Sequence, residues 1–176
     1  MPDPTTAGEK IVSQTKEEII KEAQRIEESC LCSAKGHFVA AKFWSGFHVT
    51  IGLPTAILAA FAAASAFSDH KVAAGAISLV VTGLTAVTTF LNPNKRATSH
   101  LNAGNNYDAL QNRVRIFRTI DCWGDNSDQV LTKRVKDHSE DKNKLNRESP
   151  QIPTWAYWLA KRGIEAGQAD YQVDVK

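Results

Sequence analysis

Two long apolar stretches dominate the pattern of hydrophobic and polar positions along this chain. They cover residues 48–67 and 72–91, and only the four residues 68–71 separate them. Neither 49–67 nor 72–91 contains Asp, Glu, Lys, Arg or His. As an α-helix, each stretch would rise about 30 Å, which matches the hydrocarbon core of a bilayer. Because the linker can do little more than reverse the chain, the pattern predicts a transmembrane hairpin.

Chain length argues against the alternative, a hairpin buried inside a large soluble helical protein. A helix that is apolar on every side lies either deep in a large core or in lipid. The chain has 176 residues, and its remaining sequence is too polar to enclose two such helices. The first stretch begins only at His48, behind a charged, helix-prone segment, and this position excludes a signal peptide.

The flanks of the hairpin show helical periodicity. Residues 15–42 predict a lead-in helix that continues into the first span, preceded by a flexible N-terminus over 1–14. Asn92-Pro93 predicts a break after the second span. Residues 92–167 then predict helices, with a loop at 122–126, a polar helix over 127–146, and an amphipathic helix over 154–167 after Pro150 and Pro153. Residues 168–176 are expected to form a flexible tail.

The sequence thus predicts an all-α membrane protein, in which long cytoplasmic helices extend a two-helix transmembrane hairpin (43–91) and form a small bundle. Apolar positions at helical spacing predict the core of this bundle. They are Ile19, Ile20, Ala23, Ile26, Leu31, Ala34 and Phe38 before the hairpin, and Leu101, Tyr107, Leu110, Val114, Phe117, Val130, Leu131, Val135 and Leu145 after it. So few apolar residues make a thin core, which we expect neighbouring subunits to complete.

Charged residues beside the spans predict the orientation. Lys35 and Lys42 precede the first span, and Lys95 and Arg96 follow the second. Because cationic residues are retained in the cytoplasm, both termini are expected there. The chain is therefore expected to be a multi-pass protein of the inner (plasma) membrane.

The second span carries small and hydroxyl residues on one face. Ser78, Thr82, Thr85 and Thr89 fall within a narrow arc, together with Gly75. Such a stripe is a candidate pore lining. The alternative is packing alone, because Ser and Thr hydroxyls often bond to the carbonyl four residues earlier and small residues allow close helix contact.

The first span has a face of small residues. Gly52, Ala56, Ala59 and Ala63 follow the small-xxx-small spacing that lets helix backbones approach. Together with Gly75, they are candidate helix-packing positions, against either the second span or another subunit. Since a single hairpin cannot enclose a channel, any pore requires a homo-oligomer.

The remaining chemistry is sparse. Basic residues near the membrane are candidate contacts for an anion or for lipid headgroups: Lys95, Arg96, Arg113, Arg115 and Arg118. The net charge of +2 does not call for a nucleic-acid partner. The three cysteines and five histidines lack metal-ligand spacing, and no catalytic motif is present. We therefore expect no catalytic site, no metal and no cofactor.

Short motifs around the hairpin resemble those of the SLATT family, which consists of bacterial two-transmembrane effector domains associated with nucleotide-signalling defence systems. The resemblance covers about residues 34–167. It rests on the charged lead-in, the paired spans with their short turn, and these motifs: Leu91-Asn92-Pro93, Lys95-Arg96-Ala97, His100, Tyr107-Asp108-Ala109-Leu110 and Ser149-Pro150-Gln151-Ile152-Pro153-Thr154-Trp155-Ala156-Tyr157. It implies an effector that disrupts the membrane or forms a pore, in response to a nucleotide signal or a signalling enzyme acting in trans.

Two function hypotheses follow from these patterns. The first is an oligomeric, pore-forming membrane effector that depolarises the cell and causes death or arrest in antiviral defence. The second is a non-conducting membrane scaffold that recruits a cytoplasmic partner. A membrane enzyme is a third class, for which no motif in the sequence argues.

Overall fold

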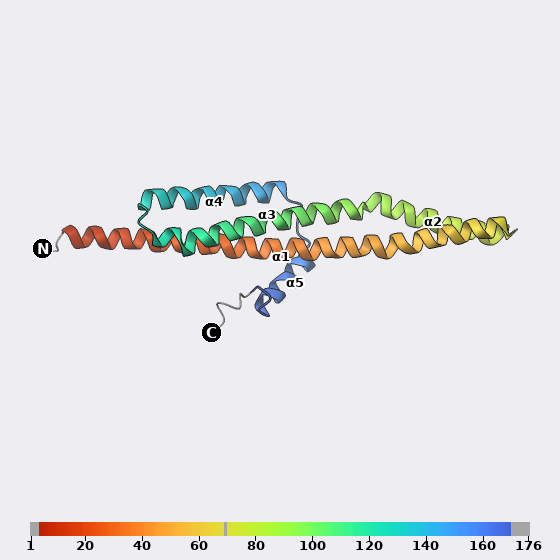
Figure 1. The fold of residues 1–176 in the computed structure, drawn as a ribbon, viewed down its shortest axis with the longest axis horizontal. Coiled ribbons are helices and arrows are strands. Elements are labelled where there is room, and N and C mark those ends of the chain that lie inside the picture. The colour runs from red at the N-terminus through yellow and green to blue at the C-terminus, as the bar shows by residue number, and fades with distance from the viewer. Residues whose placement is uncertain (1–3, 69, 170–176) are drawn as a thin grey trace. The chain divides into compact units, whose positions relative to one another are not determined.

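The computed structural model describes residues 4–68 and 70–169, with side chains from residue 14 onward, and this part of the chain is all-helical. Figure 1 shows the helices α1 (Pro4–Phe67), α2 (Lys71–Leu91), α3 (Pro93–Thr119), α4 (Asp128–Glu148) and α5 (Thr154–Glu165). A short 3-10 helix, η1 (Asp121–Trp123), links α3 to α4. The chain divides into two compact units, which we call the bundle (Met1–Val39 and Leu101–Lys176) and the hairpin unit (Ala40–His100).

The long helix α1 contains both the lead-in helix and the first span, as the sequence predicts. It also continues through Pro54. The expected start at residue 15 is wrong, because α1 begins at Pro4. Proline is favoured at the first position of a helix, since its missing N–H would have no partner there and its fixed φ suits the helix. Of the expected flexible N-terminus, only residues 1–3 lie outside the described part.

The break after the second span is confirmed. Asn92 adopts a left-handed conformation, with φ of 43°, and its N–H donates to the Thr88 carbonyl at 3.0 Å. Asparagine tolerates this conformation better than most residues. Pro93 then opens α3, so the chain ends one helix and starts another within two residues.

The expected loop at 122–126 is partly wrong, because η1 occupies its start and Cys122 is completely buried. The side chain of Asn126 donates to the Asp121 carbonyl at 3.0 Å, and Arg134 pairs with the Asp121 carboxylate at 2.7 Å. These contacts give the turn a fixed shape that composition alone does not predict.

The bundle core lies where α1, α3 and α4 meet. Figure 1 shows α4 alongside α3, and Tyr107 of α3 donates to Asn146 Oδ1 of α4 at 2.7 Å. Most of the predicted apolar positions enter this core, although Leu101 and Val130 are exposed. The core consists of Ile19, Ala23, Ile26, Cys30, Ala34, Tyr107, Leu110, Val114, Phe117, Cys122, Leu131 and Val135, with Ile20, Phe38 and Leu145 packed against it.

Two glycines allow close packing within the bundle. A Cβ at Gly104 would lie 2.7 Å from Cε1 of Phe38, which is closer than two carbon atoms can pack. A Cβ at Gly36 would lie 3.1 Å from Cγ2 of Ile152, in the segment that leads into α5. Phe38 and Ile152 therefore contact the backbone of the facing helix directly.

Candidate functional site

The hairpin unit contains two helices that are long and apolar enough to cross a membrane. In the most apolar 18-residue segment of each helix, the buried share of the segment is 6% in the first helix and zero in the second. Large apolar side chains such as Leu53, Phe61, Leu79 and Phe90 are exposed. A core helix of a soluble protein would bury these side chains, whereas lipid accommodates them at no cost.

The burial pattern identifies the faces on which the two spans pair. In the first span, Ala62 is buried, and half-buried residues recur on the same side at helical spacing. In the second span, Ala74 is buried, and a similar row of half-buried residues lies on its side of the helix. The half-buried residues of the two rows are Ile51, Thr55, Leu58 and Ser65, and Ile77, Val81, Leu84, Thr88 and Leu91.

The hydroxyl stripe of the second span does not belong to this pairing face. Ser78, Thr82, Thr85 and Thr89 are all exposed. At 100° per residue, the stripe lies about 100° around α2 from the pairing face. The second span therefore presents the stripe outward and pairs through a different row, which includes Ile77, Val81 and Leu84.

The small-residue face of the first span is also unpaired. Ala56, Ala59 and Ala63 are exposed, and Gly52 is half-buried, but a Cβ added at Gly52 would meet nothing within 4 Å. This face lies about 100° around α1 from the pairing face. The expectation that it packs against the second span is therefore wrong, and packing against another subunit stays a prediction.

These two faces lie on the same side of the hairpin. The two spans are antiparallel. In each span, the face of small or hydroxyl residues is reached from the pairing face by a rotation of about 100° around the helix axis, in the sense in which successive residues follow one another. In an antiparallel pair, that rotation carries both faces to one side. We call this the small side. Ile57, Phe61, Val80 and Val87 are exposed on the opposite, large side, whereas Leu53 and Leu79 are exposed on the faces turned away from the partner span.

Hydroxyl groups on the second span donate to the backbone of their own helix. Thr82 Oγ1 donates to the Ser78 carbonyl at 2.8 Å, and Thr89 Oγ1 donates to the Thr85 carbonyl at 2.8 Å. A hydroxyl bonded in this way keeps acceptor lone pairs, so it suits both a wet surface and a packed one. The geometry leaves both interpretations of the stripe open.

Arg96 links the end of the second span to the aromatic residues at the start of the first. Its Nε donates to the Leu91 carbonyl at 2.8 Å, and its guanidinium lies 5.1 Å from the ring centroid of Trp44. Trp44 also makes edge-on ring contacts with Phe43 and Phe47. Lys95 and Arg96 are both exposed, but Arg96 makes these two contacts at the base of the hairpin. The sequence predicts a basic residue at position 96 beside the membrane, but it does not predict the contact of Arg96 with Trp44.

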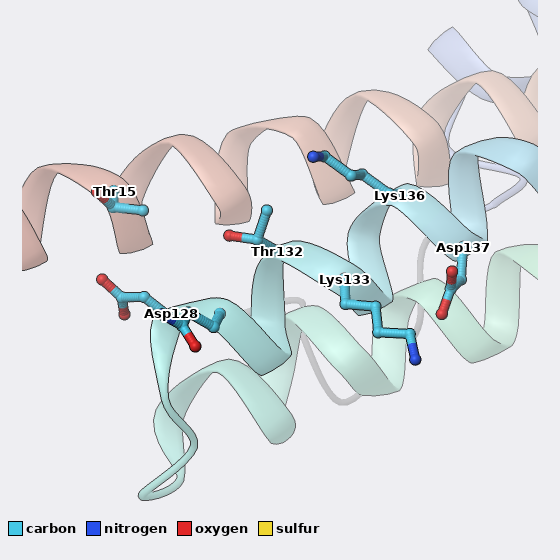
Figure 2. A pocket seen from close by; sticks show the side chains of 7 residues that line it. Thr15, Asp128, Thr132, Lys133, Lys136 and Asp137 are labelled. Carbon is cyan, nitrogen blue, oxygen red and sulfur yellow. The ribbon is translucent and has the colours of Figure 1, made fainter.

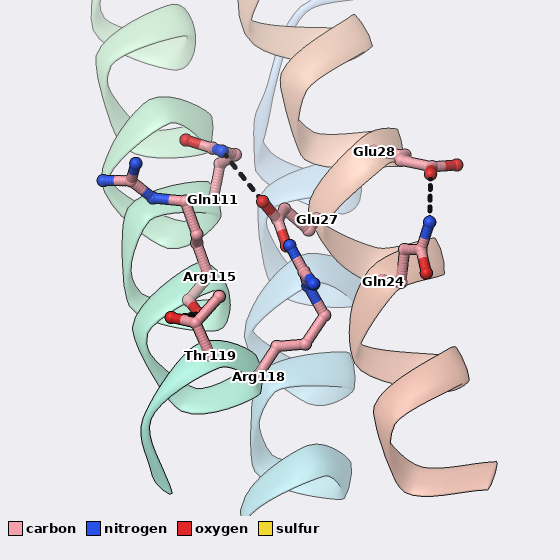
Figure 3. A network of polar contacts seen from close by, with 7 residues as sticks. All are labelled: Gln24, Glu27, Glu28, Gln111, Arg115, Arg118 and Thr119. Atoms are coloured by element: carbon pink, nitrogen blue, oxygen red, sulfur yellow. Dashed lines mark hydrogen bonds and ion pairs between the residues drawn. The ribbon is translucent and has the colours of Figure 1, made fainter. Parts of the chain in front are cut away.

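The three arginines of α3 do not form the expected single anion-binding or lipid-binding patch. Arg113 pairs with Asp141 of α4 at 3.3 Å, and Arg118 pairs with Glu27 of α1 at 2.7 Å. Figure 3 shows Glu27 between Arg118 and Gln111, whose Nε2 donates to the other carboxylate oxygen at 3.5 Å. The Arg118 side chain is therefore held by a carboxylate inside the bundle, whereas the Arg113–Asp141 pair lies on its exposed surface. Arg115 donates to Asn112 Oδ1, its neighbour one turn earlier, at 3.3 Å.

A cavity of about 370 Å³ between α3 and α4 contains a histidine that the sequence did not single out. His138 lies edge-on to Phe117 at 5.3 Å, and its Nδ1 is buried without a hydrogen-bond partner. Burial lowers the pKa of His138, and Arg113 lowers it further. Only the packing of α3 on α4 creates this environment, so no pattern along the chain could have found it.

A second hollow, of about 560 Å³, lies between the start of α4 and the N-terminal part of α1 (Figure 2). Its lining includes Thr15 from α1 and Asp128, Lys133, Lys136 and Asp137 from α4. The lining contains two lysines and two aspartates, so it favours neither an anion nor a cation. Within residues 14–68 and 70–169, no group of three or more His, Cys, Asp or Glu side chains could hold a metal ion.

The buried thiols and the Tyr107 phenol belong to the bundle core. Burial raises the pKa of the Cys30 thiol to about 11, and it also raises the pKa of Cys122. His37 stacks on Tyr107, with ring centroids 5.5 Å apart. These groups stabilise the packing of α1 on α3.

Comparison of the chain with protein-family models, with characterised proteins and with solved structures found no match. The all-helical architecture with two long apolar helices is therefore established from the structure of this chain and not from a relative. The likeness to the SLATT family rests on the motifs quoted above, and what it implies is taken up as a proposal.

Proposed function

We propose that this protein is a bacterial membrane effector of the SLATT type, which assembles into a homo-oligomer through its hairpin and forms a pore. Opening of the pore depolarises the inner membrane and causes death or arrest of the cell during antiviral defence. Both termini and the bundle lie in the cytoplasm, where the bundle receives a nucleotide signal or a signalling enzyme in trans.

The two-sided hairpin is the observation that supports this proposal. A membrane anchor needs only an apolar surface, and helices in lipid associate mainly through small residues and interhelical hydrogen bonds. Here the small residues and the hydroxyls gather on one side, while large apolar residues occupy the other. The small side suits contact with further copies, and the large side suits lipid. In a closed ring of hairpins, the hydroxyl stripe supplies the polar surface that water requires.

Conduction is tested by removing hydroxyls from the stripe. The double variant Thr82→Val and Thr85→Val keeps the shape of both side chains but loses their oxygen atoms. We expect it to abolish the depolarisation that a potential-sensitive dye reports after induced expression, at equal protein level in the membrane. The matched control is Thr88→Val, which removes a hydroxyl from the pairing face. Unchanged depolarisation in the double variant would rule out the stripe as a pore lining.

Assembly through the small side is tested separately. Ala59→Leu with Ala63→Leu places two large side chains on the small side, and cross-linking in the membrane should then yield fewer oligomers. The control is Ala60→Leu with Ala64→Leu, on exposed positions about 100° further around the same helix. An equal loss of oligomers in both variants would contradict assembly through the small side.

A non-conducting scaffold is the second candidate, and the backbone hydrogen bonds of Thr82 and Thr89 favour it. Hydroxyls that donate to their own helix can serve helix packing without any water. This candidate predicts that expression leaves the membrane potential unchanged, with and without neighbouring gene products, while the oligomer still forms. The dye measurement therefore separates the two candidates.

A further inference from the structure

The short helix α5 exposes an unusual amount of aromatic surface for part of a cytoplasmic bundle. It packs through Ala156 and Ala160, which are both buried. Four positions between and beside them carry large exposed side chains: Trp155 (41% exposed), Tyr157 (47%), Trp158 (58%) and Leu159 (46%). A contiguous apolar group of this kind marks a surface that another apolar phase or molecule covers.

The composition of this surface matches the boundary between water and lipid. Trp and Tyr combine an apolar ring with a polar tip, and they are enriched where acyl chains meet headgroups. At 100° per residue, Trp155, Trp158 and Arg162 lie on the face opposite the buried alanines. The Arg162 guanidinium lies 5.6 Å from the ring centroid of Trp158. A cation is therefore held beside the indole ring, where a lipid phosphate would accept its hydrogen bonds.

We propose that α5 is an interfacial helix that lies in the headgroup layer of the bilayer, with Trp155 and Trp158 at the acyl boundary and Arg162 at the phosphates. The proposal rests on the membrane insertion of the hairpin but not on conduction. With 12 residues, α5 rises about 18 Å, too little to span a bilayer but enough to lie on its surface. Lys161 and Arg162 outnumber Glu165, so the charge of the helix complements anionic headgroups.

The segment before α5 packs on a part of α1 that lies close in sequence to the first span. Ile152, two residues before the helix, packs against the backbone at Gly36. Gly36 stands near the end of the α1 segment that belongs to the bundle, and Val39 is the last residue of that segment. The segment before α5 is therefore fixed on the part of the bundle that precedes the hairpin most closely in sequence.

Tryptophan fluorescence of the full chain, reconstituted into vesicles of phosphatidylcholine and phosphatidylglycerol, tests this proposal. The chain has four tryptophans, so Trp44→Phe with Trp123→Phe leaves only those of α5. A matched variant keeps only Trp123, which is exposed in the bundle. With brominated phosphatidylcholine in the vesicles, we expect the α5 tryptophans to be quenched roughly threefold or more strongly than Trp123 and to emit at shorter wavelength. Acrylamide in the water should quench in the reverse order.

Two results would overturn the proposal. If the α5 tryptophans behave like Trp123, the helix faces water. If they are shielded from acrylamide but insensitive to brominated lipid, a second copy or another protein covers them instead. A variant that keeps only Trp44 reports insertion of the hairpin itself. Quenching of Trp44 without quenching of α5 contradicts only the interfacial helix, whereas loss of both contradicts the membrane location on which the proposed function depends.

Discussion

Replacement of Gly104 by alanine should weaken the bundle, although alanine is the better helix former. Inside a helix, the change from Gly to Ala normally stabilises by about 1 kcal/mol. At this position, the new Cβ would lie 2.7 Å from Cε1 and 2.8 Å from Cδ1 of Phe38. Carbon atoms pack at about 3.5–4.0 Å, so the ring must move by about 1 Å. Overpacking of a core costs about 1–3 kcal/mol, which leaves a net destabilisation of up to about 2 kcal/mol.

Hydrogen–deuterium exchange of the full chain in detergent micelles measures this effect. A loss of up to about 2 kcal/mol should speed the exchange of peptides from α3 by up to about 30-fold. Two further variants separate the clash from other causes. Gly46→Ala, where a Cβ meets nothing within 4 Å, should not speed exchange. Phe38→Leu removes the ring edge and should restore most of the protection in the Gly104→Ala background. Additive effects of the two changes, or slower exchange in Gly104→Ala alone, would refute the reasoning.

Three more predictions concern buried polar groups of the bundle. Tyr107→Phe removes the hydrogen bond to Asn146 and should lower the free energy of unfolding by about 1 kcal/mol, measured as a lower urea midpoint of the helical signal. Because burial raises the pKa of Cys30 to about 11, maleimide should label it more slowly than the half-buried Cys32 at pH 8, and peptide mass spectrometry can compare the two. The pKa of His138 is lowered in the folded chain, so its contribution to stability is present above about pH 6.5 and is lost as the pH falls below that value. His138→Gln should therefore make the urea midpoint less dependent on pH between 7 and 5, and an unchanged slope would contradict this assignment.

Local signals in the sequence predicted most of the secondary structure. The sequence predicts the Asn92-Pro93 break and the starts of α4 and α5 to within a residue or two, because proline and asparagine act on their own backbone. The start of α1 was missed, since Pro4 opens a helix within the segment 1–14, which was expected to be flexible. The turn at Cys122 was also missed, because its shape depends on the contact of Arg134 with Asp121.

The candidate site was also predicted only in part from the sequence. The positions of the hydroxyl stripe and of the small residues follow from helical periodicity, but periodicity does not say which face meets the partner helix. For Arg113 and Arg118, sequence proximity suggested one patch, whereas neighbouring helices supply a separate carboxylate for each. Long side chains find their partners across helices, and spacing along one helix does not identify those partners.

The sequence alone determined that this chain has two charge-free apolar helices joined by a short turn. A hydrophobic run and its flanking charges act locally, through the transfer of each side chain out of water. Only the tertiary structure decided how each span is rotated about its axis, and hence that small and hydroxyl residues share one exposed side. That rotation depends on the fit of Ala62 and Ala74 between the paired helices, and a fit between two surfaces exists only once both are in place.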